Sequence, residues 1–261
     1  MPPSRAPDRL DRGRAPREDP REDADTGPLH VVRAAPPRRA ARRRTPLLLC
    51  AVLALALAAA AVVWRTGPPG WGADPEVWVD GSEHGDWLAV FNGEGSTTFD
   101  DGALRLSPRP AARPQETHAG LVVSMAHYDD VDWTVTMHTL EQTRVGAPNP
   151  WEVGWVLWAY SDHDRAYYFT LKPNGWELGK LDPRFEGGQR FLATGGAPAE
   201  EGVPHRVRVR QLAATVDVWV DGRHVVTYTD AEDPYLSGAV GMYSEDAVVE
   251  FTGMRAQPAR R

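Results

Sequence analysis

A run of nineteen uncharged, apolar residues at positions 46–64 (PLLLCAVLALALAAAAVVW) constrains the architecture of this 261-residue chain more than any other feature. About 20 apolar residues are enough to cross the hydrocarbon core of a bilayer as an α-helix. The run separates an N-terminal segment rich in Arg and Pro from a C-terminal segment rich in Trp and acidic residues. The sequence therefore predicts a tail, one transmembrane helix and one exposed domain.

Charge on the two sides of the apolar run predicts its orientation. Six arginines lie between positions 33 and 44, whereas Arg65 is the only basic residue in the next stretch of about forty residues. Basic flanks stay on the cytoplasmic side, so we expect a single-pass protein of the plasma membrane with its C-terminal domain extracellular. The alternative is a signal peptide cleaved near Ala58–Ala61, which would give a secreted protein. The anchor is favoured because the run is long for a signal peptide.

Composition predicts the remaining boundaries. Residues 1–45 contain few large aliphatic side chains and are predicted to be a disordered cytoplasmic tail. Residues 65–76 form a Gly/Pro-rich linker, and residues 77–257 form the folded domain. Cys50 is the only cysteine of the chain, which excludes disulfides and thiolate chemistry from that domain.

The charge balance restricts the class of partner. The chain has a formal net charge of −7, and its first 44 residues contain twelve of the 29 basic residues but only seven of the 36 acidic ones. The rest of the chain is therefore strongly acidic. Binding to nucleic acid depends on Lys and Arg that neutralise phosphate, so we expect no nucleic-acid partner. Neutral ligands and divalent cations are compatible with this charge.

Apolar residues in the C-terminal segment recur with a period of two, the pattern of half-buried strands. Val131–Thr139 (VDWTVTMHT), His205–Leu212 (HRVRVRQL) and Thr215–Val220 (TVDVWV) show it most clearly. About a dozen short strands and no helix are expected after Trp64.

Three dipeptides between such strands have the composition of hairpin turns, namely Asp101-Gly102, Asn174-Gly175 and Asp221-Gly222. The fold class predicted is all-β, a two-sheet antiparallel jelly-roll sandwich.

The order of the aromatic hairpins carries a family resemblance. WVLWAYSDHDRAYYFTLKPNGWELGK at Trp155–Lys180 is followed by FLATG at Phe191–Gly195, VWVDGRHVVTYTD at Val218–Asp230 and LSGAVGMYSEDAVVEF at Leu236–Phe251. This order resembles the concanavalin A-like lectin/glucanase superfamily. It is similar in particular to laminin-G-like and family 16 glycoside hydrolase-like domains of bacterial surface proteins, including those labelled 3-keto-disaccharide hydrolase-like. The resemblance covers roughly residues 87–254.

Aromatic residues are dense between positions 151 and 176, which favours carbohydrate binding because sugar rings stack on aromatic side chains. Strand alternation predicts Trp155 and Leu157 on one face and Trp158 and Tyr160 on the other. We expect the second face to be a wet, concave binding surface. Its candidate residues are Trp158, Tyr160, Tyr168, Lys172 and Glu177, with His138 and Arg208 as neighbours. The alternative is that these residues are ordinary core and solvated surface.

Two other classes of function stay open. Glycoside hydrolysis normally needs two carboxylates, and the glucanases of the superfamily carry them in an E-x-D-x-x-E arrangement that this sequence lacks. We therefore predict no catalytic residue, and action on a 3-keto sugar rests on the resemblance alone. A protein–protein interaction module is the third class, since the fold serves that role as well.

A structural Ca²⁺ is the one cofactor that the family resemblance implies. Members of the superfamily often carry one near the sandwich edge, and hard cations take several oxygen ligands. Asp129, Asp130 and Asp132 cluster before a strand and are the candidate ligands. Related domains have acidic residues after the final Phe, whereas Thr252 follows Phe251 here, which weakens the case for calcium. The sequence as a whole predicts a surface-displayed, lectin-like module that binds a glycan or polysaccharide.

Overall fold

The computed structural model describes residues 74–260. The predicted tail at 1–45 and the predicted membrane span at 46–64 lie outside these residues. Within the described part there are sixteen strands and a single short 3-10 helix, η1 (Glu186–Gly188). No helix of this part is long and apolar enough to cross a membrane.

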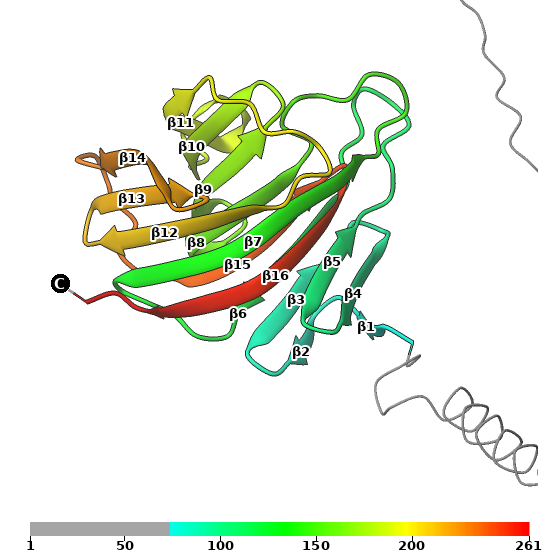
Figure 1. Ribbon diagram of the computed structural model, residues 1–261, viewed down its shortest axis with the longest axis horizontal. Coiled ribbons are helices and arrows are strands. Elements are labelled where there is room, and N and C mark those ends of the chain that lie inside the picture. Colours follow the sequence, from blue (N-terminus) through cyan, green and yellow to red (C-terminus); the bar gives the residue numbers. More distant parts are fainter. Residues whose placement is uncertain (1–73, 261) are drawn as a thin grey trace, which may run out of the picture. The chain divides into compact units, whose positions relative to one another are not determined.

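The sixteen strands form two antiparallel sheets of eight strands each (Figure 1). The first sheet has the order β1 (Glu76–Trp78), β4 (Ser96–Asp100), β5 (Ala103–Ser107), β16 (Ala247–Pro258), β7 (Val131–Gln142), β12 (His205–Leu212), β13 (Thr215–Val220) and β14 (Arg223–Thr229). The second has the order β11 (Gln189–Gly195), β10 (Gly175–Leu181), β9 (Arg165–Lys172), β8 (Gly154–Asp162), β15 (Ala239–Glu245), β6 (Ala119–Ser124), β3 (Trp87–Phe91) and β2 (Ser82–His84). The predicted all-β sandwich is confirmed.

Two of the three predicted hairpin turns form as expected. Asp101-Gly102 joins β4 to β5 and Asp221-Gly222 joins β13 to β14, and all four residues have positive φ, as a type I′ turn requires. The third turn is shifted by one residue, because Lys172 pairs with Gly175 across the β9–β10 hairpin.

The main hydrophobic core lies between the two sheets. Trp133, Val135 and Val209 reach it from the first sheet, and Val156 and Phe169 reach it from the second; all five side chains are fully buried. In Figure 1 the long strands β7 and β16, which pair with each other, run side by side through the first sheet.

The two sheets differ on their outer sides. On the first sheet the strands alternate, so that polar side chains such as Thr134 and Arg208 face outward between core residues. On the second sheet β8 and β9 are each buried over six consecutive residues. Continuous apolar runs of this kind are typical of strands that are covered on both faces. The outer side of the second sheet is therefore the unusual surface of the molecule.

Candidate functional site

A β-bulge at Ala159 decides which aromatic residues of β8 face outward. Ala159 has φ of +48°, and the pairing of β8 with β9 shifts between Trp158 and Asp162. Trp158 is fully buried in the core and stacks on Tyr167 at 5.6 Å, whereas Tyr160 packs in the outer cluster. The two residues lie on opposite faces, and the prediction that Trp158 faces solvent is wrong.

Three aromatic rings from three strands form the centre of the outer surface. Trp155 on β8 lies 4.5 Å from the Tyr168 ring on β9 and 5.4 Å from the Tyr243 ring on β15, measured between centroids. A Cβ atom on Gly179 would lie 2.4 Å from Cζ of Tyr168, so this glycine provides the space for the tyrosine ring. We call the outer surface of β8, β9, β10 and β15 that carries these rings the aromatic face.

A charged pair hydrogen-bonds to this group at the β9–β10 hairpin. The hydroxyl of Tyr168 donates to Oε1 of Glu177 over 2.8 Å, and Nζ of Lys172 donates to Oε2 of the same carboxylate. Burial, together with the nearby Glu177 carboxylate, raises the pKa of Tyr168. The structure thus brings together three of the predicted binding residues, and the opposite charges of Lys172 and Glu177 balance.

A second glutamate lies on the same face two residues beyond Tyr243. The hydroxyl of Tyr243 donates to Oε2 of Glu245 over 3.0 Å. Burial raises the pKa of Glu245 to about 7, and the neighbouring carboxylates of Asp246 and Glu152 act in the same direction. A large share of Glu245 is therefore protonated at neutral pH, so it can donate as well as accept a hydrogen bond.

The residues of the aromatic face differ in solvent exposure, and only some of them are accessible to a ligand. Trp155 is 3% exposed and Tyr168 0%, so neither ring can stack directly on a ligand. Partial exposure remains for the polar and aromatic groups around them, namely Tyr160, Lys172, Tyr243 and Glu245.

Two more exposed rings lie beside the face. Trp151 is 46% exposed, and its carbonyl accepts a hydrogen bond from Nε1 of Trp155. Phe191 is 64% exposed on β11, where it pairs with Gly179 next to the Tyr168 ring. Together with Tyr243 and Glu245, these residues were not among the predicted site residues. The period of two in β15, with Val240 and Met242 in the core, is the signal that could have placed Tyr243 and Glu245 on the outer side.

A buried ionic network fixes the loops at one end of the aromatic face. Arg144 forms an ion pair with Glu152 and donates to Oδ2 of Asp246 over 2.9 Å, and both carboxylates are fully buried. The same guanidinium donates to the carbonyls of Arg113 and Glu116, each at 2.9 Å. The network ties the loops before β6 and before β8 to the β15–β16 turn, directly after Glu245.

The expected neighbours His138 and Arg208 lie elsewhere. Both are in the first sheet, on β7 and β12, whereas the aromatic face belongs to the second. Arg208 donates to both oxygens of Asp132, at 2.8 and 2.6 Å, and lies over the Trp219 ring at 4.9 Å. Their prediction as neighbours of the binding surface is therefore wrong, because β12 and β9 are in different sheets.

The three aspartates predicted as calcium ligands do not form a common site, and two of them have separate partners. Asp132 pairs with Arg208, and Oδ1 of Asp130 accepts a hydrogen bond from the backbone of Ala213 over 2.7 Å. Asp129 is exposed. Among residues 74–260 no group of three or more Asp, Glu, His or Cys side chains is arranged to hold a metal ion.

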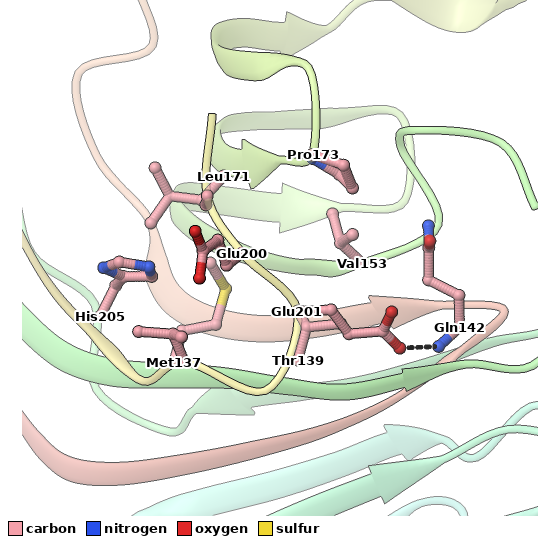
Figure 2. A pocket seen from close by; sticks show the side chains of 11 residues that line it. Met137, Thr139, Gln142, Val153, Leu171, Pro173, Glu200, Glu201 and His205 are labelled. Atoms are coloured by element: carbon pink, nitrogen blue, oxygen red, sulfur yellow. Dashed lines mark hydrogen bonds between the residues drawn. The ribbon is translucent and has the colours of Figure 1, made fainter. Parts of the chain in front are cut away.

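A cavity at the end of the sandwich is too small for a sugar. It lies beneath the segment 196–204, which hydrogen-bonds to the backbone of both Lys172 and Thr139 (Figure 2). Met137, Val153 and Leu171 line it, and its volume is about 20 Å³. Such a space holds roughly one water molecule.

Comparisons with known proteins identify structures of similar fold. No family model and no curated protein matches the sequence. The carbohydrate-binding module CBM66 from Bacillus subtilis is similar in structure, with a TM-score of 0.52 and 14% identity over 69% of this chain and 96% of that one. A Bacillus subtilis protein with a galectin-like fold gives 0.50 and 16% over 67% and 90%, and the exoplasmic/lumenal domain of VIP36 gives 0.48 and 15% over 71% and 89%. At these identities the likeness to the two Bacillus subtilis structures shows the fold alone, a galectin-like β-sandwich.

Proposed function

We propose that the described domain is a carbohydrate-binding module and that the aromatic face is its binding surface. One observation carries the proposal. Partly exposed rings stand next to a hydrogen-bond donor, Lys172, and a carboxyl group that can both donate and accept, Glu245. Sugars need this combination, because their rings have apolar faces and their hydroxyls need polar partners.

Charge on the face favours a neutral or weakly charged glycan. Lys172 and Glu177 form an ion pair, and Glu245 is largely uncharged up to a pH of about 7. No unpaired cation is left among these groups to attract a sulfated or phosphorylated polymer. The similarity to CBM66, which is a carbohydrate-binding module, supports the same class of ligand.

We propose further that the apolar run at 46–64 displays the domain on the cell surface, with the tail in the cytoplasm. The support is the excess of arginine before the run. An external protease added to intact cells should then remove the domain and spare an epitope tag on the N-terminus. Loss of both, or recovery of the domain from the culture medium, would contradict the anchor.

The binding proposal is tested with the full-length chain on purified neutral polysaccharides (cellulose, chitin, mannan, xylan and galactan). We expect saturable binding to at least one of them, weakened at least tenfold by Trp151→Ala combined with Phe191→Ala, which corresponds to about 1.4 kcal/mol. These two rings are exposed, so their removal should leave the fold intact. Trp219→Ala in the first sheet is the matched control and should bind like the unchanged chain.

Binding that survives the double substitution would place the site elsewhere in the domain. Failure to bind any of the polysaccharides would contradict the proposal and favour a protein partner for the aromatic face.

A hydrolase is the second candidate, and Glu245 is the observation that favours it. A carboxyl group whose pKa is raised to about 7 is suited to act as a general acid, and Glu177 lies on the same face. Glu177 and Glu245 are on β10 and β15, with β9 and β8 between them. Three strand spacings of about 4.8 Å separate their backbones by roughly 14 Å, which is far from the 5–5.5 Å between the carboxyl groups of a retaining pair.

The hydrolase candidate has its own test. Reducing sugar should be released from a bound polysaccharide, and Glu245→Gln should abolish the release while binding persists. Binding without any release would leave the domain a binding module only.

A further inference from the structure

A buried ammonium group lies at the centre of the loop between β14 and β15. Lys180 on β10 is fully buried, and its Nζ donates to Oδ2 of Asp230 over 2.7 Å. It donates also to the backbone carbonyls of Glu232 and Asp233, at 3.0 and 3.1 Å. The Tyr235 ring lies 4.8 Å from the same nitrogen.

The same carboxylate accepts two further hydrogen bonds at this loop. Oδ2 of Asp230 accepts the hydroxyl of Tyr167 over 2.7 Å, and Oδ1 accepts the backbone N–H of Glu232 over 3.0 Å. The Tyr167 oxygen in turn accepts the backbone N–H of Tyr235 over 3.1 Å. One carboxylate oxygen and two carbonyl oxygens therefore converge on one positive charge, and the loop is wrapped around it.

This arrangement is that of a cation site, but a metal ion does not fit it. Ca²⁺ takes six to eight oxygen ligands at about 2.3–2.6 Å, whereas three oxygens converge here and the ammonium occupies the point where they meet. The single carboxylate of Asp230 matches one positive charge rather than two. The residues around Lys180 thus do not fit a bound calcium ion.

We propose that Lys180 is the built-in cation of this domain, that it orders the loop at positions 230–235 in place of a metal ion, and that deleting its side chain opens a binding site for a primary alkylammonium ion. The three oxygens and the Tyr235 ring would then accept the added ammonium as they accept that of Lys180. A quaternary ammonium ion has no N–H group and cannot replace it.

The test measures the melting temperature of the full-length chain and of Lys180→Ala, Lys180→Met and Lys172→Met. EDTA and CaCl₂ should each change the melting temperature of the unchanged chain by less than about 1 °C. Lys180→Met should melt about 10 °C lower, because Asp230 then remains buried without its charged partner. n-Butylammonium chloride should restore part of the loss in Lys180→Ala, whereas tetramethylammonium chloride should not.

A control variant and a double variant separate the proposed role of Lys180 from a general loss of stability. Lys172→Met removes an ammonium whose side chain is 14% exposed and on which no backbone carbonyls converge, so n-butylammonium should not raise its melting temperature. If Lys180→Ala fails to fold, Lys180→Met combined with Asp230→Asn should melt higher than Lys180→Met alone, since no buried charge is left unpaired. Destabilisation of the unchanged chain by EDTA, no recovery with n-butylammonium in a folded Lys180→Ala chain, or equal melting of the single and double variants would overturn the proposal.

Discussion

The two outer faces of the sandwich are built from the same kind of strand and have opposite chemistry. On the first sheet two outward ion pairs lie at the surface, with Arg208 2.6 Å from Asp132 and Arg105 3.2 Å from Glu250. On the second sheet Trp155 lies outward and is nevertheless only 3% exposed, since neighbouring rings cover it.

The difference shows that the outer side of the second sheet contributes both to packing and to the chemistry of the candidate site, whereas the outer side of the first sheet does not combine the two. An antiparallel sheet with one wet face normally alternates apolar and polar residues, as β12 does. The apolar outer side of β8 and β9 adds a second layer of packing. That layer also removes water from Glu245, whose pKa burial raises to about 7. Packing and site chemistry are therefore coupled on the second sheet and separate on the first.

The largest effect is expected when one tryptophan on each outer face is replaced by alanine and the two losses of stability are compared. Trp155→Ala should lower the free energy of unfolding by about 3–5 kcal/mol, because it leaves a cavity among Tyr168 and Tyr243. Trp219→Ala should cost about 1 kcal/mol, mainly the contact with Arg208, since the ring is partly exposed. Urea unfolding of both variants measures the two values. Equal losses would show that the outer side of the second sheet is no more tightly packed than that of the first.

The fold was largely predictable from the sequence, because its signals are local. Alternation in β7 and β12 and the turns Asp101-Gly102 and Asp221-Gly222 each depend on a few adjacent residues. Which sheet each strand joins is a long-range property. Adjacent residues do not reveal it, and His138 and Arg208 were therefore expected beside Tyr168. They lie in the first sheet, whereas Tyr168 lies in the second.

The candidate site was predictable only in part. Tyr168, Lys172 and Glu177 were placed on one face because they flank a hairpin whose pairing is short and regular. Trp158 was misplaced because alternation separates the two faces of β8 but does not say which of them packs in the core: Trp155 and Leu157 face outward and Trp158 inward. Tyr160 reaches the outer face only through the bulge at Ala159, and alanine at positive φ gives no sequence signal. Glu245 was missed because its unusual pKa comes from burial by other strands.

The next test replaces Glu245, whose carboxylate is desolvated on the second sheet, by glutamine. The pKa of Glu245 rises from an ordinary 4.5 to about 7 on folding. The unfolded chain therefore binds fewer protons than the folded chain between these values, and stability contributed by this group falls as pH rises through that window. Glu245→Gln should consequently gain about 3 kcal/mol over the unchanged chain at pH 8 and less than about 1 kcal/mol at pH 5.

Denaturant titrations of both chains at pH 5 and pH 8 measure this difference. A gain of the same size at both pH values would mean that Glu245 does not titrate in this range.

The smallest effect is expected for the ion pair of the first sheet. Arg208→Ala should cost about 0–1 kcal/mol of unfolding free energy, because Arg208 is 44% exposed and water screens its attraction to Asp132. Salt weakens exposed pairs, so the difference between Arg208→Ala and the unchanged chain should shrink further in 1 M NaCl. Polysaccharide binding should be unchanged, since no aromatic-face residue contacts this pair in residues 74–260. If Arg208→Ala weakened binding as strongly as the Trp151→Ala and Phe191→Ala pair, the ligand surface would lie on the first sheet, and the contrast between the two outer faces would need the opposite functional interpretation.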